Sequence, residues 1–293
     1  MISPLPNINP KTVRCALEAM LAEDIGSGDV TTALFPSGKQ VEAYYVSRAD
    51  AVMCGAPFVS ILFEVSEGKV SVEPLVEEGA TFQAGTKLIR VCGCAATILT
   101  VERTSLNLLS RLCGIAAKTR KFVALAGGRT EIFDTRKTTP LLRQFEKYAV
   151  MVGGGRNHRM GLYDQVLVKD NHLTLLSGQS REEFASLVSR ARSQAEGLKV
   201  EVEVDNVEQF KALLAAEPDI ILLDNMSLED MASCCRMRDE HAKNGGASVI
   251  LEASGGISEA TVKAISRTGV DRLSAGSLTY GPKVVDIGLD FVA

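Results

Sequence analysis

The sequence has no tryptophan, only five tyrosines, and a formal net charge of -4. A protein surface that binds nucleic acid needs a basic face or a row of aromatic side chains on which bases stack. This chain offers neither in quantity. Its composition, 46% hydrophobic and 23% charged, is that of an ordinary globular chain with a large core. We therefore expect no nucleic-acid partner.

Long apolar runs are also missing. The first residues, MISPLPNINPK, have prolines where a signal peptide needs an apolar segment. The longest uncharged stretch, residues 51–63, is too short to span a bilayer and contains Gly55 and Pro57. We expect a cytoplasmic protein with no membrane partner.

The seven cysteines lack the spacing of a zinc site. Cys92 and Cys94 are separated by one residue, and Cys234 and Cys235 are adjacent, so neither pair forms a CxxC motif. An odd number of cysteines also argues against a complete disulfide framework. We expect reduced thiols that mostly fill the core.

The first 114 residues have the pattern of a mixed α+β domain. Asn9 and Pro10 are typical of a helix start, and apolar residues follow at helical spacing. Short extended runs separated by glycine-containing turns come next, and then an apolar stripe predicts a helix over residues 98–112. The three extended runs cover residues 41–47, 69–76 and 86–91.

The pattern changes near residue 115, and the C-terminal part, residues 115–293, alternates between strands and helices. Helix-like stretches such as residues 181–195 and 208–217 separate the extended segments. This alternation predicts a parallel sheet, open or rolled into a barrel. The six expected strands are residues 130–134, 165–169, 200–204, 219–224, 248–253 and 271–276.

Polar residues or glycines follow every one of these strands. Any single group has an ordinary explanation as a turn or a helix cap. In an α/β barrel, however, the carboxyl ends of all strands open onto one face, where active sites are built. We therefore predict a site at this face. The strand-end residues are Asp134, Arg136 and Lys137; Lys169, Asp170, Asn171 and His172; Glu203 and Asp205; Asp224 and Asn225; Ser254, Gly255 and Gly256; and Gly276.

The residue types indicate an anionic ligand. Five potential cationic donors are present: Arg136, Lys137, His158, Arg159 and Lys169. The arginines favour carboxylate or phosphate, which a planar guanidinium grips with two hydrogen bonds. Glycine-rich loops at Gly255 and Gly276 let backbone N–H groups approach a phosphate. Glu203 and Asp224 suit Mg²⁺ or ribose hydroxyls. The pattern leaves open whether Glu201 contacts ligand or forms a buried ion pair with a strand-end lysine.

The segment GGGRNHR, residues 153–159, joins glycines to a cluster of basic residues. Three glycines allow the chain to turn sharply, which would bring His158 and Arg159 onto the ligand. Arg156 is the member that we expect at the surface.

Several motifs together resemble the quinolinate phosphoribosyltransferase family, the decarboxylating enzymes that make nicotinate mononucleotide. The resemblance extends from about Glu23 to the final segment GVDRLSAGSLTYGPKVVDIGLDF. It implies an N-terminal α/β sandwich domain and a C-terminal incomplete α/β barrel, with the last segment packing back on the first domain. The motifs are EDIGSGDVTT, ERTSLNLLSRLCGIA, DTRKTTPLLRQFEKYAVMVGGGRNHRMGLYDQVLVKDNH, EVEVDN, LLDNM and LEASGGI.

The resemblance also implies the chemistry. Quinolinate and phosphoribosyl pyrophosphate would give nicotinate mononucleotide, CO2 and pyrophosphate with Mg²⁺, as a glycosyltransferase step of NAD biosynthesis, in a homodimer whose active sites are shared between subunits. Lys137 would lie between quinolinate and pyrophosphate, and Glu203 and Asp224 near the ribose and metal. Arg136, His158, Arg159 and Lys169 would surround the quinolinate carboxylates, with Arg103 from the other subunit, and Ser254, Gly255 and Gly276 would hold the 5′-phosphate.

Two positions depart from the family pattern. The resemblance leads us to expect glycine at Leu141 and serine at Cys113. Leu141 bears on the geometry directly after Lys137. Two alternatives to the family reaction stand beside it: a related phosphoribosyltransferase for another anionic heterocycle, and a non-catalytic barrel that senses phosphorylated metabolites.

Overall fold

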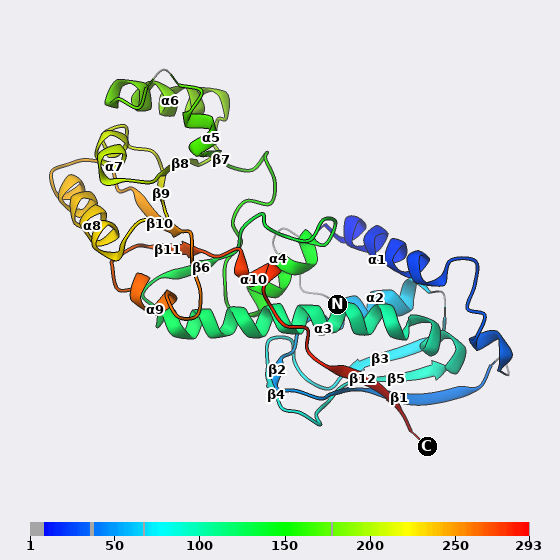
Figure 1. The fold of residues 1–293 in the computed structure, drawn as a ribbon. Helices are drawn as coiled ribbons and strands as arrows, with labels where there is room; N and C mark the ends of the chain where they lie inside the picture. Colours follow the sequence, from blue (N-terminus) through cyan, green and yellow to red (C-terminus); the bar gives the residue numbers. More distant parts are fainter. Residues whose placement is uncertain (1–8, 36–37, 67, 177, 293) are drawn as a thin grey trace. The chain divides into compact units, whose positions relative to one another are not determined.

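The computed structural model describes residues 9–35, 38–66, 68–176 and 178–292. Most of the N-terminal segment on which we based the expectation of no signal peptide lies outside these residues. The chain divides into two compact units (Figure 1). Among the described residues, no helix is both long and apolar enough to cross a membrane. The sheet unit comprises Met1–Arg120, Thr138–Gly154 and Thr279–Ala293, and the barrel unit comprises Lys121–Lys137 and Gly155–Leu278.

The sheet unit is built on a four-stranded antiparallel sheet of order β12-β1-β5-β3. Strand β1 (Gln40–Ser47) pairs with β5 (Lys87–Cys94) on one side and with β12 (Ile287–Phe291) on the other. The end of the chain therefore pairs with a strand near its beginning. Strand β3 (Val70–Pro74) pairs with β5, and β2 (Ala51–Val52) pairs with β4 (Thr81–Phe82) in a separate ribbon.

Three helices lie on one face of this sheet in Figure 1: α1 (Pro10–Ile25), α2 (Ala56–Val65) and α3 (Ala95–Ala126). The predicted start of α1 is confirmed, because the side chain of Asn9 accepts hydrogen bonds from the amides of the first helical turn. Apolar side chains from these helices and the sheet fill the core between them. The sheet unit also contains η1 (Thr32–Leu34) and α4 (Arg143–Val152), and α10 (Ser277–Tyr280) lies where the chain enters it.

Helix α3 is longer than the sequence predicted, with 32 residues in place of the expected residues 98–112. Gly114 normally weakens a helix interior, because glycine loses more conformational freedom on folding than other residues. Here it allows a close approach: a Cβ at this position would lie 2.2 Å from the carbonyl oxygen of Lys283. Tertiary packing therefore keeps glycine inside a continuous helix.

The barrel unit contains a six-stranded sheet whose neighbouring strands are all parallel. Its order is β6-β11-β10-β9-β8-β7, so β6 and β7 form the two edges. The predicted six-stranded incomplete barrel is confirmed. The strands are β6 (Glu131–Phe133), β7 (Val166–Val168), β8 (Val200–Val204), β9 (Ile220–Asp224), β10 (Ile250–Ser254) and β11 (Arg272–Ser274).

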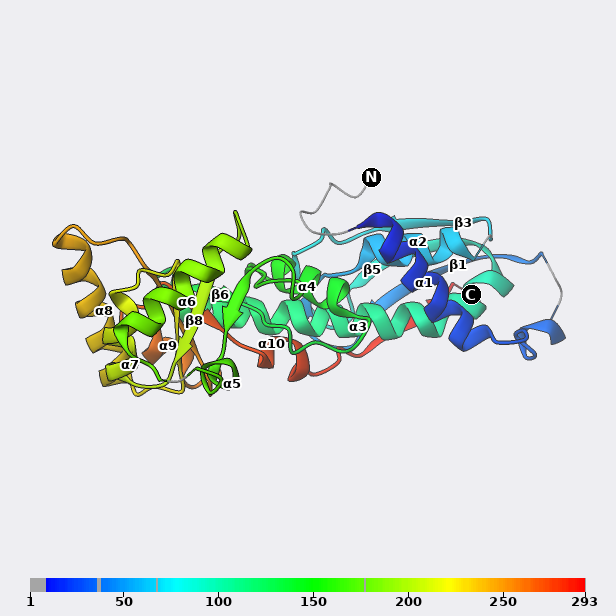
Figure 2. The ribbon, with the colours of Figure 1, turned by 90° about the horizontal axis from the view of Figure 1, so that it is seen from above.

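Helices surround the outer side of this sheet, as Figures 1 and 2 show. The predicted helix at residues 181–195 begins with a capping box, in which Ser180 and Glu183 each bond the other's backbone N–H. The helices are α5 (Asp170–Leu173), α6 (Arg181–Gln194), α7 (Val207–Leu214), α8 (Leu228–Lys243) and α9 (Val262–Ile265).

The interior of the barrel unit is not purely apolar. All five residues of β8 are buried, and two of them are Glu201 and Glu203. Buried carboxylates need partners, so these two positions lead directly to the polar groups described below. The cysteines behave as the sequence predicted: all seven are free thiols, and four of them are buried.

Candidate active site

The carboxyl edge of the six-stranded sheet gathers most of the predicted site residues. Ser254 and Asp224 end β10 and β9 and are directly paired in register. Because the strands are parallel, the residues that follow them emerge on the same edge. The other residues there are Lys169 after β7, Glu203 near the end of β8, and Gly276 after β11.

Glu203, Asp224 and Lys169 form one charged group. Glu203 is 8% exposed, and its Oε2 lies 3.8 Å from Nζ of Lys169. Burial raises the pKa of Glu203; Lys169 opposes this rise, and the charge of Asp224 adds to it. Two nearby carboxylates with a single lysine leave an excess of negative charge that a divalent cation would offset. Their hard oxygen donors fit Mg²⁺.

Arg136 and Arg159 form a second charged group. Arg159 is 9% exposed, and its Nη1 donates to the main-chain oxygen of Gln165 at 3.2 Å. Burial lowers the pKa of Arg159, and the neighbouring positive charge of Arg136 lowers it further. Two guanidinium groups held close together favour a ligand with two negative charges.

The segment that carries Arg159 is anchored on Asp134, directly after β6. The carboxylate of Asp134 accepts the backbone N–H of His158 at 2.8 Å and the side-chain amide of Asn157 at 2.6 Å. Asp164 holds the next turn by accepting the amides of Met160 and Gly161 at 2.7 and 2.9 Å. These contacts fix the main chain on both sides of Arg159.

Arg156, in the same segment, takes the surface position that the sequence predicted. It is exposed and pairs with Glu131 at 3.2 Å. The glycines before it permit the turn: Gly154 has a φ of +95°, which L-residues rarely adopt.

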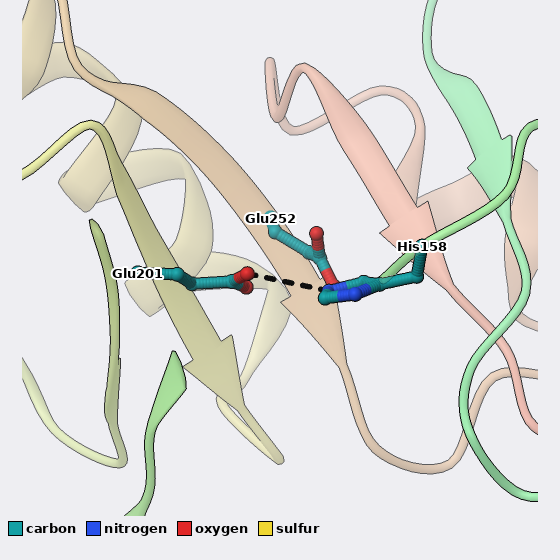
Figure 3. A group of neighbouring side chains, drawn as sticks. All are labelled: His158, Glu201 and Glu252. Carbon is teal, nitrogen blue, oxygen red and sulfur yellow. Dashed lines mark ion pairs between the residues drawn. The ribbon is translucent and has the colours of Figure 1, made fainter. Parts of the chain in front are cut away.

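A buried cluster of two acids and two bases lies behind this segment. Glu201 and Glu252 are both 0% exposed, and Figure 3 shows their side chains converging on His158. Nε2 of His158 lies 3.2 Å from Glu201 and 3.5 Å from Glu252. Arg272 supplies the second base: its Nη2 lies 3.4 Å from Glu201, and its Nε contacts Glu252.

Two observations bear on the charge of His158. Burial by itself would lower its pKa, but the hydrogen bonds to Glu201 and Glu252 outweigh burial and raise the pKa to about 9. Its Nδ1, however, accepts the amide of Arg159 at 2.8 Å, which requires an unprotonated Nδ1. We assign the neutral Nε2–H tautomer in this structure, because it satisfies both ring nitrogens. For a substrate carboxylate to bind at Nδ1, the amide of Arg159 would have to be displaced and Nδ1 would have to gain a proton.

The cluster shows what surrounds Glu201. Its carboxylate forms a buried ion pair, one of the two alternatives, but with Arg272 in place of a strand-end lysine, and it also faces Nε2 of His158. The ligand atoms of His158, Glu201 and Glu252 lie within 4.8 Å of one another, close enough to hold a metal ion. The guanidinium of Arg272 already contacts both carboxylates there, and its positive charge would repel a metal cation.

The two glycine-rich loops lie beside each other. Oγ of Ser277, the first residue of α10 after the β11 loop, donates to the carbonyl oxygen of Ile257, in the loop after β10, at 3.2 Å. Gly255 has a φ of +88°, and a Cβ there would lie 2.1 Å from Oδ1 of Asn225. Only glycine therefore fits this position. Adjacent loops of this kind, at the last strands of a barrel, suit a phosphate group.

Two further predicted residues, Lys137 and Arg103, are exposed. Lys137 is exposed, and its backbone amide donates to Oγ1 of Thr135 at 3.0 Å. Arg103 belongs to the sheet unit, where it is exposed on α3 and lines a surface hollow of about 300 Å³ together with Asn107 and Asp286. The roles assigned to both residues stay predictions.

Sequence reasoning missed four residues that contact this site. Gln165 and Asp164 have no distinctive local pattern. Glu252 and Arg272 did leave a signal, because each is a charged residue beside apolar residues in a predicted strand. Buried charges of opposite sign in one sheet imply a pair.

Comparison with known proteins identifies the family. Residues 115–290 match the model of the quinolinate phosphoribosyl transferase C-terminal domain, and residues 29–113 match the N-terminal domain. A nicotinate-nucleotide pyrophosphorylase [carboxylating] of Mycobacterium leprae is 40% identical over 94% of this chain and 96% of its own length. A probable enzyme of that name from Bacillus subtilis is 36% identical, over 97% and 94%.

Solved structures agree with the sequence matches. The nicotinate-nucleotide pyrophosphorylase of Francisella tularensis superimposes with a TM-score of 0.88 at 33% identity, covering 99% of both chains. That structure shares both units of the fold described above. On the two domain matches, the full-length relatives and this superposition, the chain belongs to the quinolinate phosphoribosyltransferase family.

Proposed function

We propose that this enzyme converts quinolinate and phosphoribosyl pyrophosphate to nicotinate mononucleotide, CO2 and pyrophosphate, a pentosyl transfer of NAD biosynthesis. One observation carries the proposal beyond family membership: the barrel unit holds both a pair of arginines and a pair of carboxylates. Arg136 lies close enough to Arg159 for its charge to lower the pKa of Arg159, and Asp224 lies close enough to Glu203 to raise the pKa of Glu203. The first pair suits a dicarboxylate, and the second suits a sugar diphosphate with its metal.

The quinolinate carboxylates would bind to cationic side chains. Arg136 and Arg159 supply guanidinium forks, Lys169 supplies an ammonium group, and His158 supplies a ring that becomes cationic if Nδ1 is protonated. Arg103 of the other subunit would add one more fork. Its exposure on α3, beside a hollow, supports this role.

Phosphoribosyl pyrophosphate would occupy the remainder of the sheet edge. Ser254, Gly255 and Gly276 lie in the adjacent glycine-rich loops and would hold the 5′-phosphate with backbone N–H groups. Glu203 and Asp224 would bind Mg²⁺ and the ribose hydroxyls. The bound Mg²⁺ would neutralise charge on the pyrophosphate that leaves. Lys137 would contribute a further positive charge between the two substrates.

The reaction places opposite charges at two ends of the ribose. As the bond between ribose C1 and pyrophosphate breaks, positive charge develops on the sugar, and the carboxylates of Glu203 and Asp224 stabilise it. Lys137 stabilises the departing pyrophosphate. The quinolinate nitrogen bonds to C1 and becomes cationic. That cation stabilises the carbanion left when the adjacent carboxylate departs as CO2, and a proton then replaces CO2 on the ring.

The protein would act as a cytoplasmic homodimer. Free thiols at all seven cysteines support a reducing compartment. A two-fold dimer would place Arg103 of each subunit in the partner's site and so complete two sites at once.

The direct test is mass detection of nicotinate mononucleotide after the protein is mixed with both substrates and Mg²⁺. We expect the product and one CO2 per nucleotide. A sensor of phosphorylated metabolites would form no product. A phosphoribosyltransferase for another heterocycle would leave quinolinate unchanged, and either result would overturn the proposal.

A further inference from the structure

Arg272 is a buried base for which the proposed reaction has no use. It lies on β11, is 8% exposed, and its guanidinium stacks at 4.8 Å over the ring of Phe133 on β6. The planar group contacts Glu252 through Nε and Glu201 through Nη2. Arg272 therefore holds two carboxylates from two other strands at a defined separation, which the point charge of a lysine would not do.

Glu201 connects this arrangement to the substrate-binding segment. Its Oε2 accepts the side-chain amide of Gln165 and also faces Nε2 of His158 at 3.2 Å. The main-chain oxygen of Gln165 in turn accepts Nη1 of Arg159 at 3.2 Å. A continuous chain of contacts thus runs from Arg272 through Glu201 and Gln165 to Arg159.

The other anchors of the segment act on its main chain. Asp134 bonds the amide of His158, and Asp164 bonds the amides of the turn after Arg159. The amide of Arg159 holds Nδ1 of the His158 ring at 2.8 Å, and the carboxylates of Glu201 and Glu252 face Nε2 on the other side of the ring. Glu201 also contacts the side chain of Gln165, so its position bears on both the His158 ring and the Arg159 guanidinium.

We propose that Arg272 is a positioning residue for recognition of the dicarboxylate: by fixing Glu201 against Glu252, it orients His158 and Arg159 without touching the substrate. The inference rests on the proposed function, which assigns those two residues to the quinolinate carboxylates. Loss of Arg272 would leave two buried carboxylates that repel each other, and Glu201 would shift away from Gln165.

Two single variants and one double variant test this role. Arg272→Lys keeps the charge and loses the fork, whereas Arg272→Met loses both. Because Arg272→Met leaves uncompensated buried charge and could unfold the barrel unit, the double variant Arg272→Met/Glu252→Gln removes one carboxylate charge as well. The matched control is Arg238→Met, because Arg238 is also largely buried in the same unit and its guanidinium pairs with Asp271 at 2.6 Å and donates to the main-chain oxygen of Val249.

The Michaelis constants of both substrates separate a positioning role from a merely structural one. For each Arg272 variant that folds, we expect the KM for quinolinate to rise about tenfold or more, because a misplacement of about 1 Å is enough for such losses. The KM for phosphoribosyl pyrophosphate should change less than about twofold. Calorimetry with phthalate, a dicarboxylate without the ring nitrogen, should show the same weakening without any turnover. Arg238→Met should change neither constant.

The possible failures are distinguishable. If the wild-type protein forms no nicotinate mononucleotide, the proposed function itself is wrong. If the wild type is active and the folded Arg272 variants keep its KM for quinolinate and its affinity for phthalate, the positioning role is wrong. Equal changes in both Michaelis constants would also overturn the positioning role, because they would indicate a general disturbance of the barrel unit.

Discussion

Leu141 has a backbone conformation that L-amino acids rarely adopt, with a φ of +67°. It follows Pro140 in a turn closed by a hydrogen bond from the amide of Leu142 to the carbonyl oxygen of Thr139, at 3.1 Å. Such a turn favours glycine at this place. The resemblance led us to expect glycine there, and the leucine has a structural consequence, which is local strain before α4.

We predict that Leu141→Gly stabilises the protein. The leucine side chain is 93% exposed and so contributes little packing, whereas relief of the left-handed conformation is worth about 1–2 kcal/mol. The greater freedom of glycine in the unfolded chain offsets part of this gain. Urea unfolding should show a free energy of unfolding higher by about 0.5–1 kcal/mol. Leu175→Gly is the control, since Leu175 is 83% exposed but lacks the positive φ, and it should not stabilise.

Lys137 and Lys169 lead to a second prediction for single residues. Both are exposed, so neither replacement should unfold the protein. Lys137→Ala and Lys169→Ala should each lower kcat by about 100-fold or more, the typical cost of removing a donor aimed at developing charge. Steady-state kinetics with circular dichroism checks both points.

Lys121→Ala is the control for these variants. The side chain of Lys121 is 60% exposed and pairs with Glu259 at 2.5 Å. Lys121→Ala therefore removes an exposed lysine and its surface ion pair, and this variant should keep a normal kcat. Near-normal turnover of folded Lys137→Ala or Lys169→Ala would contradict the role of that lysine.

At the scale of elements, α3 shows how packing overrides helix propensity. Glycine-to-alanine substitution inside a helix ordinarily stabilises by about 1 kcal/mol. At Gly114 the new methyl group would meet the carbonyl oxygen of Lys283 at 2.2 Å, and a backbone atom cannot move aside cheaply. We predict that Gly114→Ala lowers the free energy of unfolding by about 1–3 kcal/mol.

Thermal unfolding measures the effect at Gly114. The expected result is a lower Tm, with the opposite sign to the effect of propensity alone. An increase in Tm would mean that the segment around Lys283 adapts at little cost, and the close approach would then not constrain the helix.

The strands show which part of the fold a sequence pattern predicts. The alternation of apolar segments with helix patterns was sufficient to predict the six parallel strands, because a strand buried on both faces has a continuous run of apolar residues. The sequence also predicted the strand-end residues, since parallel strands place their carboxyl ends on one edge. The pairing of Glu201 and Glu252 with Arg272 could not be read this way, because it depends on strand order and register: Glu252 lies opposite Arg272 only once β10 pairs with β11, and Glu201 comes from β8 in the same sheet.

For the whole molecule, the first prediction concerns substrate choice. Quinolinate should react and nicotinate should not, because nicotinate lacks the second carboxylate that would pair with the cations assigned to the site. A site built for a polar group rejects an analogue without that group by about 10⁴-fold or more. Parallel assays of kcat/KM with both compounds provide the test. Comparable turnover of nicotinate would contradict the decarboxylating reaction.

The second prediction for the whole molecule concerns shared active sites. Arg103→Ala and Lys137→Ala should each be inactive as homodimers. After subunit exchange, half of the dimers are mixed, and each mixed dimer has one site with both changes and one with neither. About a quarter of wild-type activity should therefore return. If mass spectrometry detects mixed dimers and no activity returns, Arg103 acts within its own chain.

The sequence by itself determined the fold class, the family and the residues that end the strands at one edge of the sheet. These depend on local features: the period of apolar residues, the residues that follow each strand, and motifs that are contiguous in the chain. The tertiary structure decided how those residues are held. It showed the left-handed turn at Leu141, the close approach at Gly114 and the buried partners of His158, because each depends on atoms that only the folded chain brings together.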